Sequence, residues 1–368
     1  MSKAAELANL IGNINMGGGG VNKNAIINGA MNVSQRSTSV TGIGGSSGYY
    51  VCDRWRINTT TSGRLTMSQD SSAPIGFANS LKLDCTTADT SIASNESVIL
   101  SQRIEGQNLQ AFAKGTSDAK PFAVSFYVKG NATATYICEL RDIDNSRSAG
   151  KTFNVTTDWT RVELTFDADT TGSFDDDNAR SLDFNIFLHS GTDKTSGTLS
   201  NTFASEVAAN RAGGLSTSFF DSTDRTFFIT GVQLEVGQNP TEFEHEPYER
   251  TLSKCKRYFT VSGPYSTQDF PVAMSGYIYS TTATAAAHKI TVAMRIDNPT
   301  VAMPNGDYHV KASSATNTTQ AITGINLVDG ATSDCIMMNM AHSTLTANRV
   351  AMITNSSSGR TMTFDAEL

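Results

Sequence analysis

The chain contains few charged residues and no long apolar run. Lysine, arginine, aspartate and glutamate make up 17% of its 368 residues. The formal net charge is −7, and lysines and arginines do not cluster, so nucleic acid is not an expected partner. No stretch approaches the ~18 consecutive apolar residues that a membrane-spanning helix needs. We therefore expect neither nucleic-acid binding nor membrane insertion.

Motifs that serve catalysis or metal binding are missing as well. None of the five histidines lies in an HExxH spacing, and the chain has no GxSxG, P-loop or strand-following GxGxxG. The five cysteines are odd in number and show no CxxC spacing, which favours buried thiols over a metal knuckle. A glycosidase needs two convergent carboxylates, and no such pair can be matched from the sequence. These absences predict a protein that is not an enzyme and that requires no cofactor.

Short alternating segments dominate what is present. Apolar residues make up 39% of the chain, which is sufficient for packed cores, and small polar residues separate the apolar segments. Apolar–polar alternation bounded by turn residues predicts short strands. Trp55 and Trp159 fall in or beside such segments and are predicted to lie in a core. Strands are expected at 25–33, 50–58, 65–68, 80–85, 98–104, 122–129, 132–140, 152–155, 160–166, 181–187, 226–236, 256–261, 276–280, 288–296, 307–312, 321–327, 334–340 and 361–367. A helical turn is expected near 204–211.

Residues 2–14 form the single helix that periodicity predicts with clarity. Leu7, Leu10, Ile11 and Ile14 fall on one face at three- and four-residue steps, and four glycines follow at 17–20. A helix of about thirteen residues is marginal alone in water, so this one must dock on another surface. We predict that it attaches the protein to a partner or bundles three chains. Packing on its own domain is the alternative.

The acidic stretch DADTTGSFDDDN, residues 167–178, is the one candidate metal loop. Carboxylates are ligands that Ca²⁺ prefers, and the glycine allows the loop to turn. The stretch lacks the EF-hand spacing and its terminal glutamate, so a solvated acidic loop is the alternative. The candidate ligands of a structural calcium are Asp167, Asp169, Asp175 and Asp177.

Three stretches resemble one protein family. The run GVQLEVGQNPTEFEHEPYERTLSKCKRYF (231–259) reads as a strand followed by a connector between two β domains. It resembles a passage of tail-fibre and receptor-binding proteins of tailed bacteriophages. NAIINGAMNVSQRSTS (24–39), followed by YYVCDRWRI (49–57), resembles the opening strands of the same proteins, and the terminal DAEL resembles their C-termini. These stretches cover the start, middle and end of the chain.

The order of strands between residues 80 and 237 carries a second resemblance. The segments SLKLDC, SVILSQRIEG, PFAVSFYVKG, DWTRVELTFDA, SLDFNIFLHSG and FFITGVQLEVG resemble the jelly-roll sandwich of carbohydrate-binding modules. The resemblance implies an all-β fold: a short N-terminal helix, a jelly-roll β-sandwich and a smaller C-terminal β-sandwich. The expected regions are 1–22 for helix and glycine hinge, 23–248 for the carbohydrate-binding-module-like domain, and 249–368 for the C-terminal domain.

The phage resemblance implies a structural protein of the virion, most simply a homotrimeric tail fibre that attaches to a host surface glycan. The N-terminal helix would bind other virion proteins. No signal peptide is apparent, which fits synthesis in the host bacterial cytoplasm. Exposed aromatics among small polar residues are the expected glycan contacts. The candidates are Tyr265, Tyr277, Tyr279 and Tyr308.

Two other functions stay open from the sequence. The same sandwiches could form a non-adsorbing decoration, knob or connector protein of the virion. A surface-glycan hydrolase is the third hypothesis. Shortening of soluble polysaccharide on incubation would distinguish the hydrolase from the other two.

Overall fold

The structure is a computed structural model, and it divides the chain into two units. The residues described are 3, 23–264, 271–280, 282–289, 291–296, 299–303, 307–312, 319–327, 335–343, 345, 349–356 and 358–368. The first unit is Met1–Thr251 with Leu368, and the second is Leu252–Glu367. Strands dominate both units, so the all-β prediction is confirmed. Within the described residues, no helix has the length and apolar content required to cross a lipid bilayer.

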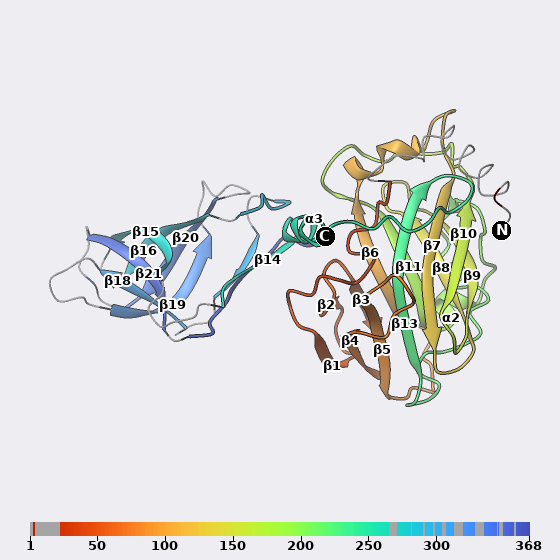
Figure 1. Cartoon of the computed structure of the whole chain (residues 1–368), viewed down its shortest axis with the longest axis horizontal. Coiled ribbons are helices and arrows are strands. Elements are labelled where there is room, and N and C mark those ends of the chain that lie inside the picture. The colour runs from red at the N-terminus through yellow and green to blue at the C-terminus, as the bar shows by residue number, and fades with distance from the viewer. Residues whose placement is uncertain are drawn as a thin grey trace. The chain divides into compact units, whose positions relative to one another are not determined.

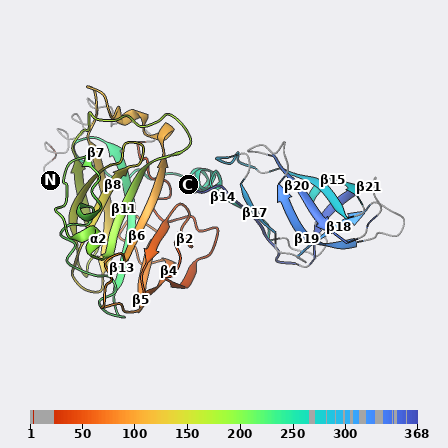
Figure 2. The same cartoon turned by 180° about the vertical axis from the view of Figure 1, so that it is seen from behind.

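Two antiparallel sheets form the sandwich of the first unit (Figures 1 and 2). Sheet A has the order β1 (Ser39–Ile43), β4 (Arg64–Asp70), β5 (Ser80–Thr87), β13 (Thr226–Val236), β7 (Phe122–Gly130) and β10 (Thr160–Phe166). Sheet B has the order β12 (Ala204–Ser205), β9 (Arg147–Val155), β8 (Ala134–Asp142), β11 (Arg180–Ser190), β6 (Ser97–Glu105), β3 (Arg56–Thr60) and β2 (Gly48–Tyr49).

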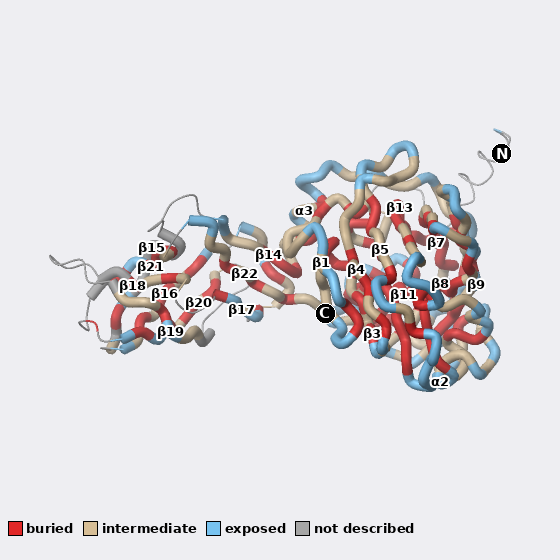
Figure 3. Tube along the Cα trace, turned by 90° about the horizontal axis from the view of Figure 1, so that it is seen from below, coloured by how far each residue is buried: buried red, intermediate tan, exposed pale blue. Residues whose placement is uncertain are grey.

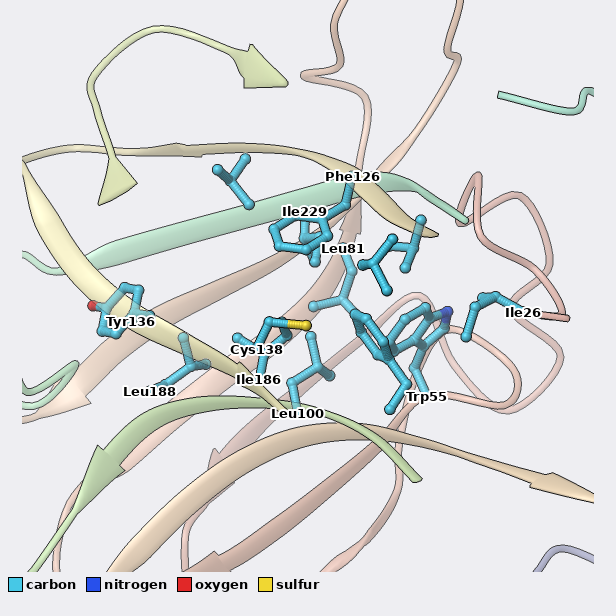
Figure 4. Packing of buried hydrophobic residues seen from close by; sticks show 14 of the residues in the cluster. Ile26, Trp55, Leu81, Leu100, Phe126, Tyr136, Cys138, Ile186, Leu188 and Ile229 are labelled. Carbon is cyan, nitrogen blue, oxygen red and sulfur yellow. The ribbon is translucent and has the colours of Figure 1, made fainter. Parts of the chain in front are cut away.

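The core of this unit lies between the inner faces of the two sheets. Alternate residues of the central strands point inward, and Figure 3 shows these strands as largely buried. Trp55 is fully buried and meets Phe184 edge to face, with ring centroids 6.0 Å apart. Figure 4 shows it in the same cluster of buried side chains as Ile26, Leu81 and Leu100. The core prediction is therefore confirmed for Trp55, whereas Trp159 is only half-buried and its core prediction is wrong.

A long segment after β11 covers part of the outer face of sheet B. It contains α2 (Thr192–Thr195) and a 3-10 turn, η3 (Ala208–Asn210), close to the predicted helical turn. Ala212 and Leu199 of this segment pack on Ile99, Ile137 and Phe187, which point away from the main core. Arg211 adds an ion pair to Glu139 of β8. Two further 3-10 turns, η1 (Gly106–Asn108) and η2 (Gln110–Phe112), follow β6.

Residues 25–33 are a series of buried turns and not the predicted strand. Asn28 and Met31 both have φ of +57°, a left-handed conformation that interrupts a ladder. The Asn28 side chain accepts a hydrogen bond from the Val33 amide at 3.0 Å and donates to the Asp53 carbonyl at 3.0 Å. These bonds satisfy the backbone without a strand partner. The apolar residues here are buried, but they do not follow strand geometry.

The second unit contains a closed barrel where the sequence predicts a smaller sandwich. The barrel order is β15 (Pro271–Ser280), β16 (Ala283–Lys289), β20 (Cys335–His342), β19 (Thr319–Leu327), β18 (Tyr308–Ala312) and β21 (Arg349–Asn355). A separate sheet has the order β14 (Phe259–Ser262), β22 (Met362–Asp365) and β17 (Thr300–Ala302). Alternation predicts one buried face per strand, but it does not tell whether the sheet edges meet.

The helix α3 (Tyr248–Lys256) replaces part of the predicted connector. The Pro247 carbonyl accepts hydrogen bonds from the Arg250 and Thr251 amides at 3.0 and 3.2 Å. Glu249 lies in its first turn and Lys254 and Lys256 in its last, which suits the helix dipole. A strand predicted to begin at residue 256 therefore begins at Phe259. The strand predicted at 288–296 is also misplaced, because β16 ends at Lys289.

Candidate ligand-binding groove

The loops at one end of the first unit enclose two adjoining hollows. These loops follow β5, β7, β9 and β11. The larger hollow has a volume of about 490 Å³ and the smaller about 330 Å³. Thr133 and Thr217 line both, so the two hollows form one open, two-lobed depression, which we call the loop-end groove. The larger lobe is lined by Ile92, Thr133, Ser190, Leu215, Ser216, Thr217, Ser218, Asp221 and Arg225, and the smaller by residues 133–135, 154–156 and 217.

Hydrogen bonds between the loops hold the groove in shape. The Thr135 amide donates to the Thr217 hydroxyl at 3.1 Å, which ties the start of β8 to the segment after β11. The Thr226 amide donates to the Asn131 side chain at 2.9 Å. The Phe219 amide donates to the Leu188 carbonyl at 2.8 Å. The loops that line the groove are therefore tied by hydrogen bonds to the strand ends.

The lining is rich in hydroxyl groups and has one charged pair. A hydroxyl both donates and accepts hydrogen bonds, so a row of serines and threonines suits a ligand that itself carries hydroxyls. Arg225 Nε donates to Asp221 Oδ1 at 2.9 Å, and this bond raises the pKa of Arg225. Ile92 is 41% exposed and offers an apolar contact at the edge. The mixture of polar groups with some apolar surface is typical of small-molecule and sugar sites.

Tyr136 places a buried hydroxyl close to this charged pair. Its side chain is 1% exposed, and its hydroxyl has no hydrogen-bond partner among the described residues. Burial raises the pKa of Tyr136, while Arg225 and Asp221 exert smaller and opposite effects. A buried hydroxyl without a partner is uncommon in proteins.

An aromatic surface lies at the same end, on the outer face of sheet A. Trp159 lies on the β9–β10 turn, of which Thr156 lines the smaller lobe, and it meets Phe228 edge to face with centroids 6.1 Å apart. The ammonium groups of Lys82 and Lys129 lie 5.4 and 5.9 Å from the Phe228 ring centroid. A half-buried tryptophan near hydroxyl-bearing residues provides a stacking platform. Sequence reasoning missed this role because it assigned Trp159 to the core.

The groove does not have the arrangement of a glycosidase. Such an enzyme needs two facing carboxyl groups, one of which acts as an acid. Among the described residues that line the groove, Asp221 is the one acid, and it is paired with Arg225. The described groove residues therefore do not form a facing carboxylate pair.

The structure does not bring the four candidate tyrosines together. Tyr277 on β15 is 47% exposed, as a contact residue should be. Tyr308 on β18 is fully buried in the barrel core, so its prediction as a surface contact is wrong. Tyr265 and the Tyr279 side chain lie outside the described residues. The helix residues Leu7, Leu10, Ile11 and Ile14 also lie outside them, and their role stays a prediction.

Lys114 occupies the centre of the loop for which the sequence predicts calcium. Its buried ammonium lies 2.6 Å from Asp142 and 3.1 Å from Asp169. It also donates hydrogen bonds to the Thr171 and Gly172 carbonyls at 2.8 and 2.7 Å. The lysine thus uses the oxygen atoms that a cation at Asp169 would need. A calcium ion bound by Asp169 would have to displace it.

The other predicted calcium ligands lie apart from this ion pair. Asp167, Asp175 and Asp177 are exposed, and Asp177 Oδ1 accepts a hydrogen bond from the Ala179 amide at 2.8 Å. Burial alone would raise the pKa of Asp169, but bonds from Arg147 and others hold it below its ordinary value. The structural calcium therefore stays a prediction.

No family model and no curated protein sequence matches the chain. Solved structures similar to it include the enzymatically active domain of tailspike protein 4 from bacteriophage CBA120, at 13% identity and a TM-score of 0.29. That match covers 58% of this chain and 21% of the tailspike, so the chain spans about a fifth of that protein.

Carbohydrate-binding modules are also among the similar structures. A family 4 module matches at 13% identity and a TM-score of 0.31, over 57% of this chain and 97% of the module. A family 11 module of the Clostridium thermocellum cellulase Lic26A-Cel5E matches at 13% identity and a TM-score of 0.28, over 57% and 100%. Similarity at these identities and TM-scores does not indicate function. The fold assignment rests on the strand order described above.

Proposed function

We propose that the chain is a non-catalytic, glycan-binding structural protein of a tailed bacteriophage, and that the loop-end groove is its glycan site. The observation that carries the glycan proposal is the groove itself, with its hydroxyl-bearing lining, the Asp221–Arg225 pair and the nearby Trp159. Sugars present hydroxyls at their edges and apolar faces to stacking rings, and this end of the sandwich offers partners for both.

The virion role is supported by the sequence resemblance to tail-fibre and receptor-binding proteins over residues 24–57, 231–259 and 365–368. In this proposal the N-terminal helix docks on other virion proteins, and three copies associate. Three shallow sites on one particle would convert weak binding of each site into strong attachment through effective concentration. The proposed glycan site lies in the first unit, and not at the second-unit tyrosines that the sequence favoured.

The test uses the full-length protein and a panel of polysaccharides isolated from bacterial surfaces. Binding is measured by calorimetry, the length of the polysaccharide is measured before and after incubation, and the mass of the protein in solution is measured by light scattering. Saturable binding, unchanged polysaccharide length and a trimer mass are the expected results. Shortened polysaccharide would establish the hydrolase instead. Absence of binding to the panel and to whole cells would establish the non-adsorbing decoration protein.

A further inference from the structure

Three buried titratable side chains meet beneath one wall of the loop-end groove. Asp89 and Glu96 belong to the loop between β5 and β6, and His189 lies near the end of β11. They are 6%, 8% and 0% exposed. One ligand atom from each of the three lies within 4.8 Å of the others. Neither the groove lining nor the predicted calcium loop includes these residues.

The two carboxylates receive hydrogen bonds from uncharged groups. Asp89 Oδ2 accepts from the Thr61 hydroxyl at 2.8 Å and the Ser62 amide at 3.1 Å. Glu96 Oε1 accepts from the Ser62 amide at 3.1 Å, and Oε2 accepts from the Ala93 amide at 2.8 Å. In the part of the chain that the structure describes, neither acid forms an ion pair with a lysine or arginine. Buried carboxylates are expected to be paired or to bind a metal.

His189 supplies the second observation. Its Nδ1 lies 2.8 Å from the Ser218 hydroxyl. Its Nε2 is buried and has no hydrogen-bond partner among the described residues. Burial lowers the pKa of His189, and the charges of Asp89 and Glu96 oppose this only in part. A metal-bound histidine typically donates its other ring N–H to a neighbouring acceptor, as Nδ1 can do here.

We propose that Asp89, Glu96 and His189 bind one divalent transition-metal cation of the Zn²⁺ class. An imidazole nitrogen with two carboxylate oxygens suits Zn²⁺ and its neighbours, whereas Ca²⁺ and Mg²⁺ prefer sites made of oxygen alone. The three side chains provide the protein ligands of a four-coordinate ion, with one position left for water. The proposal concerns a different place and a different metal from the calcium predicted at residues 167–178, and it does not depend on glycan binding.

The surrounding backbone fixes these ligands in place. The Asp89 amide donates to the Phe220 carbonyl at 2.9 Å, and the Gly191 amide donates to the Glu96 carbonyl at 2.8 Å. Gly191 fits closely, because a Cβ added there would lie 2.0 Å from the Ala93 carbonyl oxygen. Ile92, Ser190 and Ser218 of the groove lie on these same segments. A bound metal would therefore stiffen one wall of the groove.

The test is a competition titration of Zn²⁺ against a chromophoric chelator, with metal-stripped, full-length protein. The protein carries Cys335→Ser, because this thiol is only half-buried and could bind zinc itself. One equivalent of Zn²⁺ should bind, with Ca²⁺ unable to compete. Glu96→Gln and His189→Gln should each weaken binding at least about tenfold, since even supporting residues of metal sites contribute that much. Glu163→Gln, which changes an exposed acid on β10, is the matched control and should leave affinity unchanged.

Ser218→Ala keeps all three ligands and removes the hydrogen bond to His189 Nδ1, so it serves if a ligand variant fails to fold. It should weaken Zn²⁺ binding about tenfold or more. With Co²⁺ in place of Zn²⁺, the absorption spectrum should lack a thiolate charge-transfer band. Failure of the folded wild type to bind one Zn²⁺, or equal affinity in wild type, Glu96→Gln and Ser218→Ala, would overturn the proposal.

Discussion

Two pairs of buried acids lie at opposite ends of the first unit, and they differ in the groups that surround their carboxylates. At one end, Asp142 ends β8 and Asp169 follows β10, and the Lys114 ammonium lies between their carboxylates at 2.6 and 3.1 Å. At the other end, Asp89 and Glu96 share the β5–β6 loop with no lysine or arginine paired to them among the described residues. The buried imidazole of His189 lies close to both acids, with one ligand atom of each of the three within 4.8 Å of the others.

The two sites differ in whether the chain itself supplies a positive charge to its buried carboxylates. Taking a carboxylate out of water costs several kcal/mol unless an opposite charge accompanies it. The Lys114 site contains that charge within the chain, so it needs no ion. The Asp89 site contains hydrogen-bond donors but no full positive charge, so a cation from solution is the expected complement. The candidate calcium loop of the sequence, for which a solvated acidic loop was the alternative, includes Asp169 of the first site, where the chain supplies its own cation.

The largest expected loss of stability comes from removing the Lys114 ammonium. Lys114→Met should destabilise the first unit by about 3–5 kcal/mol, because two buried carboxylates lose their shared partner. Urea unfolding followed by tryptophan fluorescence reports on this unit, since both tryptophans lie in it. Lys120→Met changes a nearby half-buried lysine and should shift stability by no more than about 1 kcal/mol. Equal effects of the two substitutions would show that the Lys114 pair is not buried as described.

Replacing one acid at each site by its amide tests whether the two sites differ in their contribution to stability. Asp169→Asn loses the ion pairs with Arg147 at 2.8 Å and Lys114 at 3.1 Å, and should destabilise by about 3 kcal/mol. Glu96→Gln, measured with chelator present, relieves repulsion from Asp89 but removes the acceptor of one backbone hydrogen bond, so its net effect should stay within about 1 kcal/mol. A loss at Glu96 as large as that at Asp169 would mean that the chain already supplies a cation there.

The pH dependence of stability distinguishes the two sites further. The folded state lowers the pKa of His189, mainly through burial, so the unfolded chain takes up a proton near pH 6.5 before the folded chain does. Stability is therefore fully present above that pH and falls as the solution is acidified from pH 7 toward 5, by at most about 1.4 kcal/mol per pH unit. The pKa of Asp89 is also lowered, but its contribution is lost only at more acidic pH.

His189→Gln should flatten the stability profile between pH 7 and 5 when chelator is present. Urea midpoints at several pH values measure this for wild type and variant, and the difference removes the contribution of the other four histidines. Added Zn²⁺ should steepen the wild-type profile, because protons compete with the metal for the ligands. Identical profiles for wild type and His189→Gln would contradict a neutral, buried His189.

Local patterns predicted most strands of the first unit well. The strand expected at 226–236 is β13, Thr226–Val236, and the alternation of Val232, Leu234 and Val236 with polar residues marks its second half, although the pairing with β7 shifts register between Thr230 and Gln233. The same reasoning failed at 25–33, where Asn28 side-chain hydrogen bonds stabilise turns among equally apolar residues. The helix α3 was also missed, although a preceding proline, a first-turn acid and last-turn lysines were all visible.

The candidate sites could not be read from the chain because their members are far apart in sequence. The strands β6 to β10 lie between Glu96 and His189 in the sequence, and only the pairing of β11 with β6 brings the three residues together. Lys114 gives no local sign that it neutralises Asp142 and Asp169. The exposure of aromatic side chains could not be predicted from the sequence either. Trp159 and Tyr308 occupy similar sequence contexts, but Trp159 is half-buried and Tyr308 is fully buried.

The most direct test of glycan binding at the loop-end groove is to fill the groove and measure affinity. Thr133 is exposed and lines both lobes, so Thr133→Trp should block the groove without disturbing the core. Ser117→Trp places the same side chain at an exposed site on the opposite end and is the control. Calorimetry with a polysaccharide that binds wild type should show a loss of at least about tenfold, or about 1.4 kcal/mol, for Thr133→Trp and none for Ser117→Trp. Equal affinity for both variants and the wild type would contradict a glycan site in this groove.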